Sequence, residues 1–175
     1  DLYHAAVDTI RSVLTKSGVD KKDVVSMGIR GQMHGLVMLD EAGNVLRPSI
    51  IWCDQRTAAE CDQIHEIVGR DQLISITANP ALTGFTLSKL LWVRNHEPEV
   101  YAKCRHILLP KDYVRYMLTG DFATEVSDAS GQRVRDGDGE EVHQSGSEPE
   151  SGTGINLCCQ GESVNQRQVQ RGVQR

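Results

Sequence analysis

The stretch from residue 24 to residue 52 constrains the fold of this 175-residue chain more than any other. It contains three short, mostly apolar runs bounded by Gly, Asn and Asp, which is typical of buried strands. The runs are residues 24–29, 36–39 and 45–52. A helical spacing of apolar residues over 2–14 precedes them and stops at Gly18. Because a helix that leads into a strand through a short loop is the α/β pattern, we predict an α/β fold.

Helical spacing recurs after the third run. Thr57 and Glu60 match a capping box, in which the side chain of each residue bonds the free backbone N–H group of the other. The helix that follows is expected to end at Gly69. Further helices are expected at residues 71–76, 87–94 and 111–118 and after Pro98, and a further strand at 107–109.

The composition changes after Gly131. Residues 132–175 contain no aromatic residue, no methionine and no lysine, while Gln, Gly, Ser, Glu and Arg dominate. Such a segment buries too little apolar surface to offset the entropy lost on ordering, so we predict that it is disordered. The chain therefore divides into a partial domain, 1–131, and a low-complexity tail, 132–175. The abrupt onset of the tail also suggests an out-of-frame translation fused to a native fragment.

The composition argues against several classes of partner. The net charge is −5 and charges of both signs are interspersed, so we expect neither nucleic acid nor a membrane surface as a partner. No apolar run approaches the roughly 20 residues of a membrane span, and we expect no secretion signal. The five cysteines have no C-x-x-C spacing, which predicts free thiols in the reducing cytoplasm and no zinc site. Glycine-rich phosphate motifs and nucleophile–base pairs are not visible in the sequence.

The turn between the first two runs is the main candidate for a binding site. Gly31 and Gly35 bracket Gln32, Met33 and His34, and glycines allow the backbone to approach a ligand closely. Ligands of open sheets collect outside the strand ends, so we predict that this loop binds a small polar metabolite. Either nitrogen of the imidazole can hydrogen-bond a sugar hydroxyl. The alternative is a histidine that caps a strand or fills a crevice.

Of five further polar or aromatic residues, two have both a functional and a structural interpretation, and three have a structural one. Asp54 and Arg56 follow the third run and could reach the same pocket, or they are a helix-initiating acid and a surface charge. Lys89 and Trp92 share a helix face, and their spacing favours core packing of the indole with a snorkelling lysine. Asp112 is interpreted as an acid of a first helical turn.

Five segments that include these residues resemble the xylulokinases of the FGGY carbohydrate kinase family. They are residues 31–35, 51–56, 84–96, 109–113 and 127–131. The segment Gly84–His96 agrees at every position with the first signature pattern of that family, and the resemblance covers residues 1–131.

The resemblance implies an actin-like, ribonuclease-H-like ATPase fold with two domains around a cleft, of which this chain is part of the N-terminal domain. It implies transfer of the γ-phosphoryl group of ATP, with Mg²⁺, to D-xylulose, giving D-xylulose 5-phosphate, and it allows a homodimer of the full-length protein. It places Met33 and His34 in the sugar site, with Gln32 and Asp54 as further candidates. Glycerol kinases have an arginine and an acid there instead, which favours a ketopentose.

The resemblance also implies parts that this chain lacks. An Asp-x-Gly-Thr phosphate loop is expected before Asp1, and the catalytic aspartate well beyond Gly131. We therefore assign no catalytic, cofactor-binding or metal-binding residue in this chain and expect the isolated chain to be inactive. The absent early strands are expected to leave an exposed sheet edge. Two alternatives stay open, namely a sister FGGY kinase for another ketose or polyol, and a non-catalytic sugar-binding fragment.

Overall fold

The computed structural model describes residues 2–124, 128, 154–159 and 162–165. The chain forms two compact units, which are described separately. One unit comprises residues 1–31, 113–121 and 151–175, and the other comprises residues 32–112 and 122–150.

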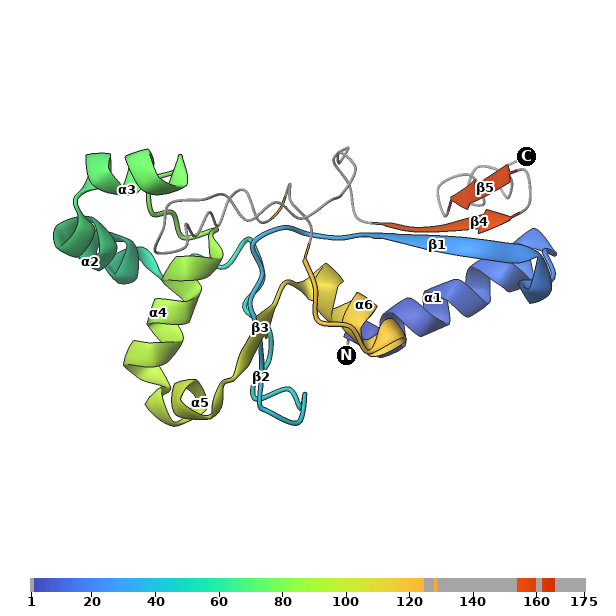
Figure 1. Ribbon diagram of the computed structural model, residues 1–175, viewed down its shortest axis with the longest axis horizontal. Coiled ribbons are helices and arrows are strands. Elements are labelled where there is room, and N and C mark those ends of the chain that lie inside the picture. The colour runs from blue at the N-terminus through green and yellow to red at the C-terminus, as the bar shows by residue number, and fades with distance from the viewer. Residues whose placement is uncertain (1, 125–127, 129–153, 160–161, 166–175) are drawn as a thin grey trace. The chain divides into compact units, whose positions relative to one another are not determined.

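Figure 1 shows the helices and strands of both units. The first unit contains α1 (Leu2–Ser17), the 3-10 turn η1 (Lys21–Asp23), β1 (Val24–Arg30), β4 (Gly154–Cys159) and β5 (Glu162–Asn165). The second contains β2 (Val37–Leu39), α2 (Ala58–Val68), α3 (Arg70–Thr77), α4 (Thr86–His96), α5 (Pro98–Lys103) and β3 (His106–Leu108). The last helix, α6 (Pro110–Thr119), begins in the second unit and continues into the first. The helices predicted from apolar spacing are therefore all present.

Glycine ends two of these helices where the sequence predicts. Gly18 follows α1 with φ +69°, and its N–H donates to the carbonyl of Leu14 at 3.2 Å. Gly69 follows α2 with φ +83° and donates to the carbonyl of His65 at 2.9 Å. Both glycines adopt positive φ, where a side chain would be strained, and each satisfies a carbonyl that the last turn leaves unpaired.

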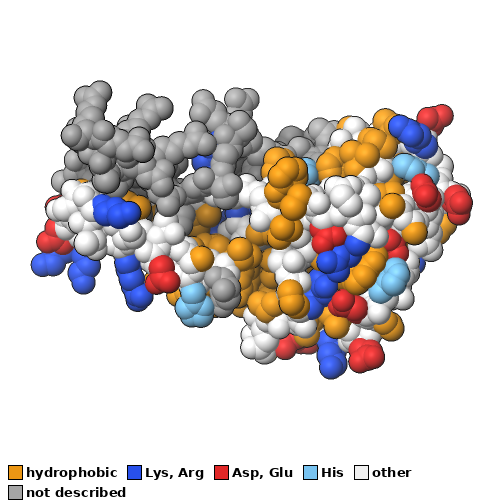
Figure 2. Space-filling model, turned by 180° about the vertical axis from the view of Figure 1, so that it is seen from behind, with side chains coloured by type: hydrophobic (Ala, Val, Ile, Leu, Met, Phe, Trp, Pro, Cys, Tyr) orange, Lys and Arg blue, Asp and Glu red, His pale blue; other side chains and the backbone are white. Residues whose placement is uncertain are grey.

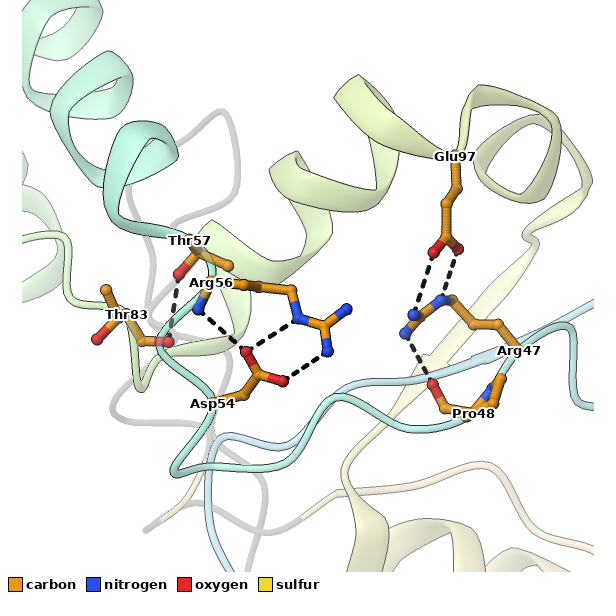
Figure 3. A network of polar contacts seen from close by, with 7 residues as sticks. All are labelled: Arg47, Pro48, Asp54, Arg56, Thr57, Thr83 and Glu97. Atoms are coloured by element: carbon orange, nitrogen blue, oxygen red, sulfur yellow. Dashed lines mark hydrogen bonds and ion pairs between the residues drawn. The ribbon is translucent and has the colours of Figure 1, made fainter.

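The predicted capping box at the start of α2 is wrong. Thr57 is the N-cap residue, but its side chain makes no capping hydrogen bond. Its buried hydroxyl lies 3.1 Å from the Oγ of Ser88. It also lies 3.4 Å from the carbonyl oxygen of Thr83 (Figure 3). Glu60 is also buried, and it accepts from Asn95 on α4 at 3.4 Å. Because α2 packs against α4, both side chains are withdrawn from water, and they bond partners from the α4 region instead of the local backbone.

The strand β1 begins where the sequence predicts and ends one residue later, at Arg30, but the prediction that it is buried is wrong. Val25 is 60% exposed and Met27 is 37% exposed, so no other part of the described chain covers these two side chains completely. β1 pairs antiparallel with β4, and β4 pairs antiparallel with β5, in the order β1-β4-β5. Within the described residues, the second edge of β1 has no partner strand.

The tail contributes β4 and β5 to this sheet. An unpaired strand edge presents a row of N–H and C=O groups with which another segment can pair, and Gly154–Cys159 pairs with β1 in this way. The remainder of 132–175 lies outside the described residues. Its disorder and its out-of-frame origin stay predictions.

Residues 45–52 run antiparallel to β2, but they do not form the continuous strand that the sequence predicts. Leu36 and Ile50 exchange two backbone hydrogen bonds, of 2.8 and 3.1 Å. Pro48 has no N–H group to donate, and the segment is left with isolated bridges in place of a ladder.

A small apolar core holds the second unit together. It consists of Leu36, Met38, Ile50 and Val93, each at most 1% exposed. β2 pairs antiparallel with β3, and all three of its side chains are buried. Trp92 packs against this core, as predicted. The core thus joins the residues that directly follow the candidate loop to the 45–52 segment and α4.

An ion pair fixes the interrupted segment to the end of α4. The Nε and Nη2 atoms of Arg47 donate to the carboxylate of Glu97 at 2.7 and 3.2 Å, and Nη1 donates to the carbonyl of Pro48 at 2.7 Å (Figure 3). The Arg47 side chain is only 10% exposed. Two parallel charge-assisted bonds to a partly buried carboxylate are stronger than an ordinary surface pair.

Replacing Glu97 by glutamine is expected to lower the free energy of unfolding by about 1 kcal/mol, because one charge-assisted bond is lost while the shape is kept. Urea denaturation of the chain measures this. Glu99→Gln is the matched control, since Glu99 is exposed on α5 and its replacement removes the same charge. Equal losses in the two variants would show that the Arg47 pair adds nothing.

Candidate functional site

The loop Gln32–Gly35 is held on both sides by its neighbours in the second unit. The Oε1 atom of Gln32 accepts the backbone N–H of Trp52 at 3.1 Å. Gly35 lies so close to Pro110, at the start of α6, that a Cβ atom would overlap the proline ring. Gly35 is therefore required by close packing and not by an unusual φ.

His34 has a backbone conformation that is rare for a residue with a side chain. Its φ is +59°, in the left-handed region that normally favours glycine or asparagine. Such conformations cost of order 1 kcal/mol and persist only where the surroundings enforce them. The loop therefore presents this imidazole in a direction that an ordinary extended backbone would not give.

Three residues surround His34. The Nζ atom of Lys89 donates to its backbone carbonyl at 2.7 Å. The ring of Phe85 packs against the imidazole, with 4.5 Å between ring centroids. The Oδ1 atom of Asp128 lies 3.9 Å from Nδ1. The side chain of His34 is 18% exposed, so it is neither enclosed in the core nor fully solvated.

Burial favours the neutral form of the His34 ring. Burial lowers the pKa of His34 below its ordinary 6.5; the carboxylate of Asp128 opposes this shift and the ammonium of Lys89 adds to it. Burial raises the pKa of Asp128, against the opposing charges of Lys111 and His34. A neutral imidazole has one nitrogen that donates and one that accepts, which suits a hydroxyl ligand.

Asp128→Asn is expected to lower the pKa of His34 further, because it removes the negative charge that stabilises the imidazolium. In the folded chain the pKa of His34 lies below its value of 6.5 in the unfolded chain. The free energy of unfolding therefore decreases as the pH falls from 6.5 through the folded pKa, and in the variant this decrease extends to lower pH. Titration of the ring signals by NMR measures the shift. An unchanged pKa would mean that Asp128 does not act on His34, and a raised pKa would contradict the predicted sign.

A second charged cluster lies beside Asp128, at the first turn of α6. The Nζ atom of Lys111 lies 2.9 Å from Asp112 and 3.4 Å from Asp128. Asp112 is an acid of the first turn, as predicted, and is 4% exposed. The lysine thus links the carboxylate that faces His34 to the helix that touches Gly35.

The carboxylate of Asp54 accepts hydrogen bonds from a residue close to it in the sequence. The guanidinium of Arg56 donates to both carboxylate oxygens at 2.9 and 2.8 Å, and its backbone N–H donates at 3.0 Å (Figure 3). The hydrogen bond from Arg56 is the main reason that the pKa of Asp54 is lowered. The guanidinium also lies 4.7 Å from the ring centroid of Trp92. The assignment of Asp54 to a sugar site stays a prediction.

Two features of this site differ from the sequence analysis. The spacing predicted that Lys89 snorkels to the surface, and this is wrong. Lys89 is fully buried, and its ammonium group donates hydrogen bonds to carbonyl groups of two loops. Phe85 and Asp128 were not identified as neighbours of His34. Both lie in segments that carry the family resemblance, and this was the signal that could have found them. Met33 is 41% exposed, next to His34.

Other kinds of site are not formed by the described residues. No group of three His, Cys, Asp or Glu side chains in this part of the chain could hold a metal ion, and none of its helices is long and apolar enough to cross a membrane. Cys53, Cys61 and Cys104 are free thiols, as predicted. Figure 2 shows basic and acidic side chains mixed on one face of the molecule. A cavity of about 340 Å³ lies around His106 and Phe122, and His34 does not line it.

Comparison with known proteins gives a consistent result. The model of the FGGY family of carbohydrate kinases, N-terminal domain, matches residues 1–137. The xylulose kinase of Bacillus subtilis is 46% identical over 131 residues, which are 75% of this chain and 26% of that protein. The xylulose kinase of Escherichia coli is 48% identical over 110 residues, 63% of this chain and 22% of that protein. This chain thus spans about a quarter of the length of the curated relatives it matches.

Solved structures agree with the sequence comparison. The xylulose kinase of Rhodospirillum rubrum superposes with a TM-score of 0.55 at 30% identity, over 58% of this chain and 21% of that one. The chain has part of the α/β, actin-like ATPase fold, as the resemblance implied.

Proposed function

The chain belongs to the FGGY family of carbohydrate kinases, and we propose that it forms one wall of the sugar site of a kinase that phosphorylates D-xylulose with ATP. The product is D-xylulose 5-phosphate. Met33 and His34 contact the sugar, and Gln32 and Asp54 lie beside them. The kinase is a cytoplasmic protein that can form a homodimer, and the chain without its other parts is inactive.

The observation that supports this proposal best is the arrangement around His34. A neutral imidazole, partly exposed, is held at a loop with positive φ, and its Nδ1 atom faces a carboxylate. Such a ring offers its other nitrogen, Nε2, to a hydroxyl group. Xylulose kinases of several bacteria match this region at 42–48% identity, which favours D-xylulose over another sugar.

ATP and Mg²⁺ belong to the longer kinase in this proposal. The carboxylates of Asp54 and Asp128 face cations of the chain itself, since Asp54 is bonded by Arg56 and Asp128 lies 3.4 Å from Lys111. They do not form an open ligand set for a metal ion, so we assign no metal-binding or catalytic residue here. The chemistry that these residues supply is binding and orientation of the sugar.

A hybrid kinase tests the proposal. In it, the matched 131 residues of the Bacillus subtilis relative are replaced by residues of this chain. ATP-dependent phosphorylation of D-xylulose, measured by ADP release, supports the proposal. Faster turnover of another ketose or polyol than of D-xylulose would assign the chain to a sister kinase.

The isolated chain provides the second test. We expect no ATP turnover with D-xylulose, because phosphoryl transfer needs groups that position and neutralise the phosphates. Calorimetric titration with D-xylulose then measures binding alone. Saturable binding in the chain together with an inactive, correctly folded hybrid kinase would favour a non-catalytic sugar-binding fragment.

A further inference from the structure

We propose that Lys89 is a positioning residue, whose buried ammonium group clamps the Gln32–Gly35 loop to the Gly84 turn and thereby fixes the direction of the His34 side chain. The proposal deepens the proposed function, because it concerns the same site. Its central observation is a pair of hydrogen bonds from one Nζ atom. One bond, of 2.7 Å, goes to the carbonyl of His34 and the other goes to the carbonyl of Gly84.

The two acceptors lie 50 positions apart in the chain and belong to different loops. The His34 carbonyl belongs to the loop that follows β1, and the Gly84 carbonyl to the turn that begins α4. A protonated amine has three donors and no acceptor, so it can join two carbonyls that would otherwise repel each other. Phe85 follows Gly84 directly and packs on the imidazole at 4.5 Å, so that the turn holds both the backbone and the ring of His34.

The clamp acts where the backbone is strained. His34 has φ +59°, and a left-handed residue with a full side chain needs its surroundings to hold it. A charge-assisted bond at the carbonyl of that same residue supplies this. Gln32 adds a weaker restraint through its bond to the Trp52 N–H.

Burial of the lysine is costly, which argues that its contacts matter. Lys89 is 0% exposed, although a lysine on a helix can usually extend its head to water. Burial lowers the pKa of Lys89 from 10.5 to about 8, with the charge of Asp54 opposing, so the amine is mostly charged at pH 7. A buried ion that served packing alone could be replaced by an apolar side chain at no loss.

Replacement of Lys89 by an apolar side chain is therefore the experiment. Lys89→Met keeps the length and the apolar stem but removes the ammonium, and because a buried ion is lost, we expect the chain to remain folded. Val93→Ala is the matched control, since Val93 is equally buried one turn further along α4 but belongs to the apolar core. If Lys89→Met does not fold, Lys89→Gln takes its place, because its shorter amide cannot bridge both carbonyls.

The first readout is amide hydrogen exchange in the whole chain, which needs no sugar. The amides of Trp52 and Phe85 are hydrogen-bonded beside the clamp and report on its two loops, and neither residue belongs to the apolar core that contains Val93. In Lys89→Met we expect their exchange to rise about 10-fold relative to amides within α2. In Val93→Ala their exchange relative to α2 should stay the same. Equal effects of the two variants, or no effect of Lys89→Met, would overturn the clamp.

The second readout is the KM of the hybrid kinase for D-xylulose. A rise of about 10-fold in KM for Lys89→Met, with kcat less affected, is expected of a residue that orients the sugar-binding loop. A loosened loop with unchanged KM would overturn the positioning role and leave the proposed function intact. An inactive hybrid kinase would contradict the proposed function, while the exchange data would still decide the clamp.

Discussion

Replacing His34 by alanine in the hybrid kinase is expected to lower kcat/KM for D-xylulose by about 5- to 150-fold. The estimate corresponds to about 1–3 kcal/mol for a hydrogen-bonded polar contact whose partner is left unpaired. The loss should fall mainly on KM, because the imidazole holds the sugar and does not take part in the transfer of the phosphoryl group. Initial rates with varied D-xylulose measure both parameters.

Two companion variants make this result interpretable. Alanine at position 34 also meets a backbone with φ +59°, whereas asparagine tolerates that region. His34→Asn therefore separates loss of the imidazole from strain, and we expect it to unfold at nearly the temperature of the unchanged hybrid but to bind the sugar weakly. His4→Ala, on α1, is the matched control and should leave kcat/KM unchanged. Full activity of His34→Asn would remove the imidazole from the sugar site.

The helices of this chain could be predicted well from sequence because their signals are local. Apolar spacing and the glycines at 18 and 69 gave α1 and α2 with bounds close to those observed. The errors occur where tertiary contacts prevail. Thr57 and Glu60 have the spacing of a capping box, but burial against α4 gives them other partners. Pro48 was visible in the sequence and is the local signal that the third run could not be a full strand.

The candidate site was predicted in part, for a similar reason. The glycines around His34 and the family resemblance identified the loop from neighbouring residues alone. The residues that fix His34 come from 51 to 94 positions further along the chain, namely Phe85, Lys89 and Asp128. Helical spacing treats a lysine as a surface residue, and it contains no information about a pair of carbonyls brought together by two loops. The burial of Lys89 could therefore be found only from the structure.

Gly35→Ala is expected to lower the free energy of unfolding of the chain by about 1–3 kcal/mol, the usual cost of forcing a methyl group into a packed site. The added Cβ would lie 2.6 Å from the Cδ atom of Pro110 and closer still to its Cγ atom. A proline ring is held by the backbone and cannot rotate away, unlike the end of a long side chain. Either the loop or the start of α6 must shift, so weaker binding of D-xylulose should accompany the loss of stability.

Gly28→Ala is the matched control for this substitution. A Cβ at Gly28 meets nothing within 4 Å and its φ is not positive, so alanine should be neutral or stabilise by up to about 1 kcal/mol. Urea denaturation measures both variants, and calorimetric titration with D-xylulose follows for each. Unchanged stability of Gly35→Ala would mean that the loop can move away from Pro110, which would contradict a rigidly held His34. A loss of stability with unchanged sugar affinity would instead place the sugar away from this loop.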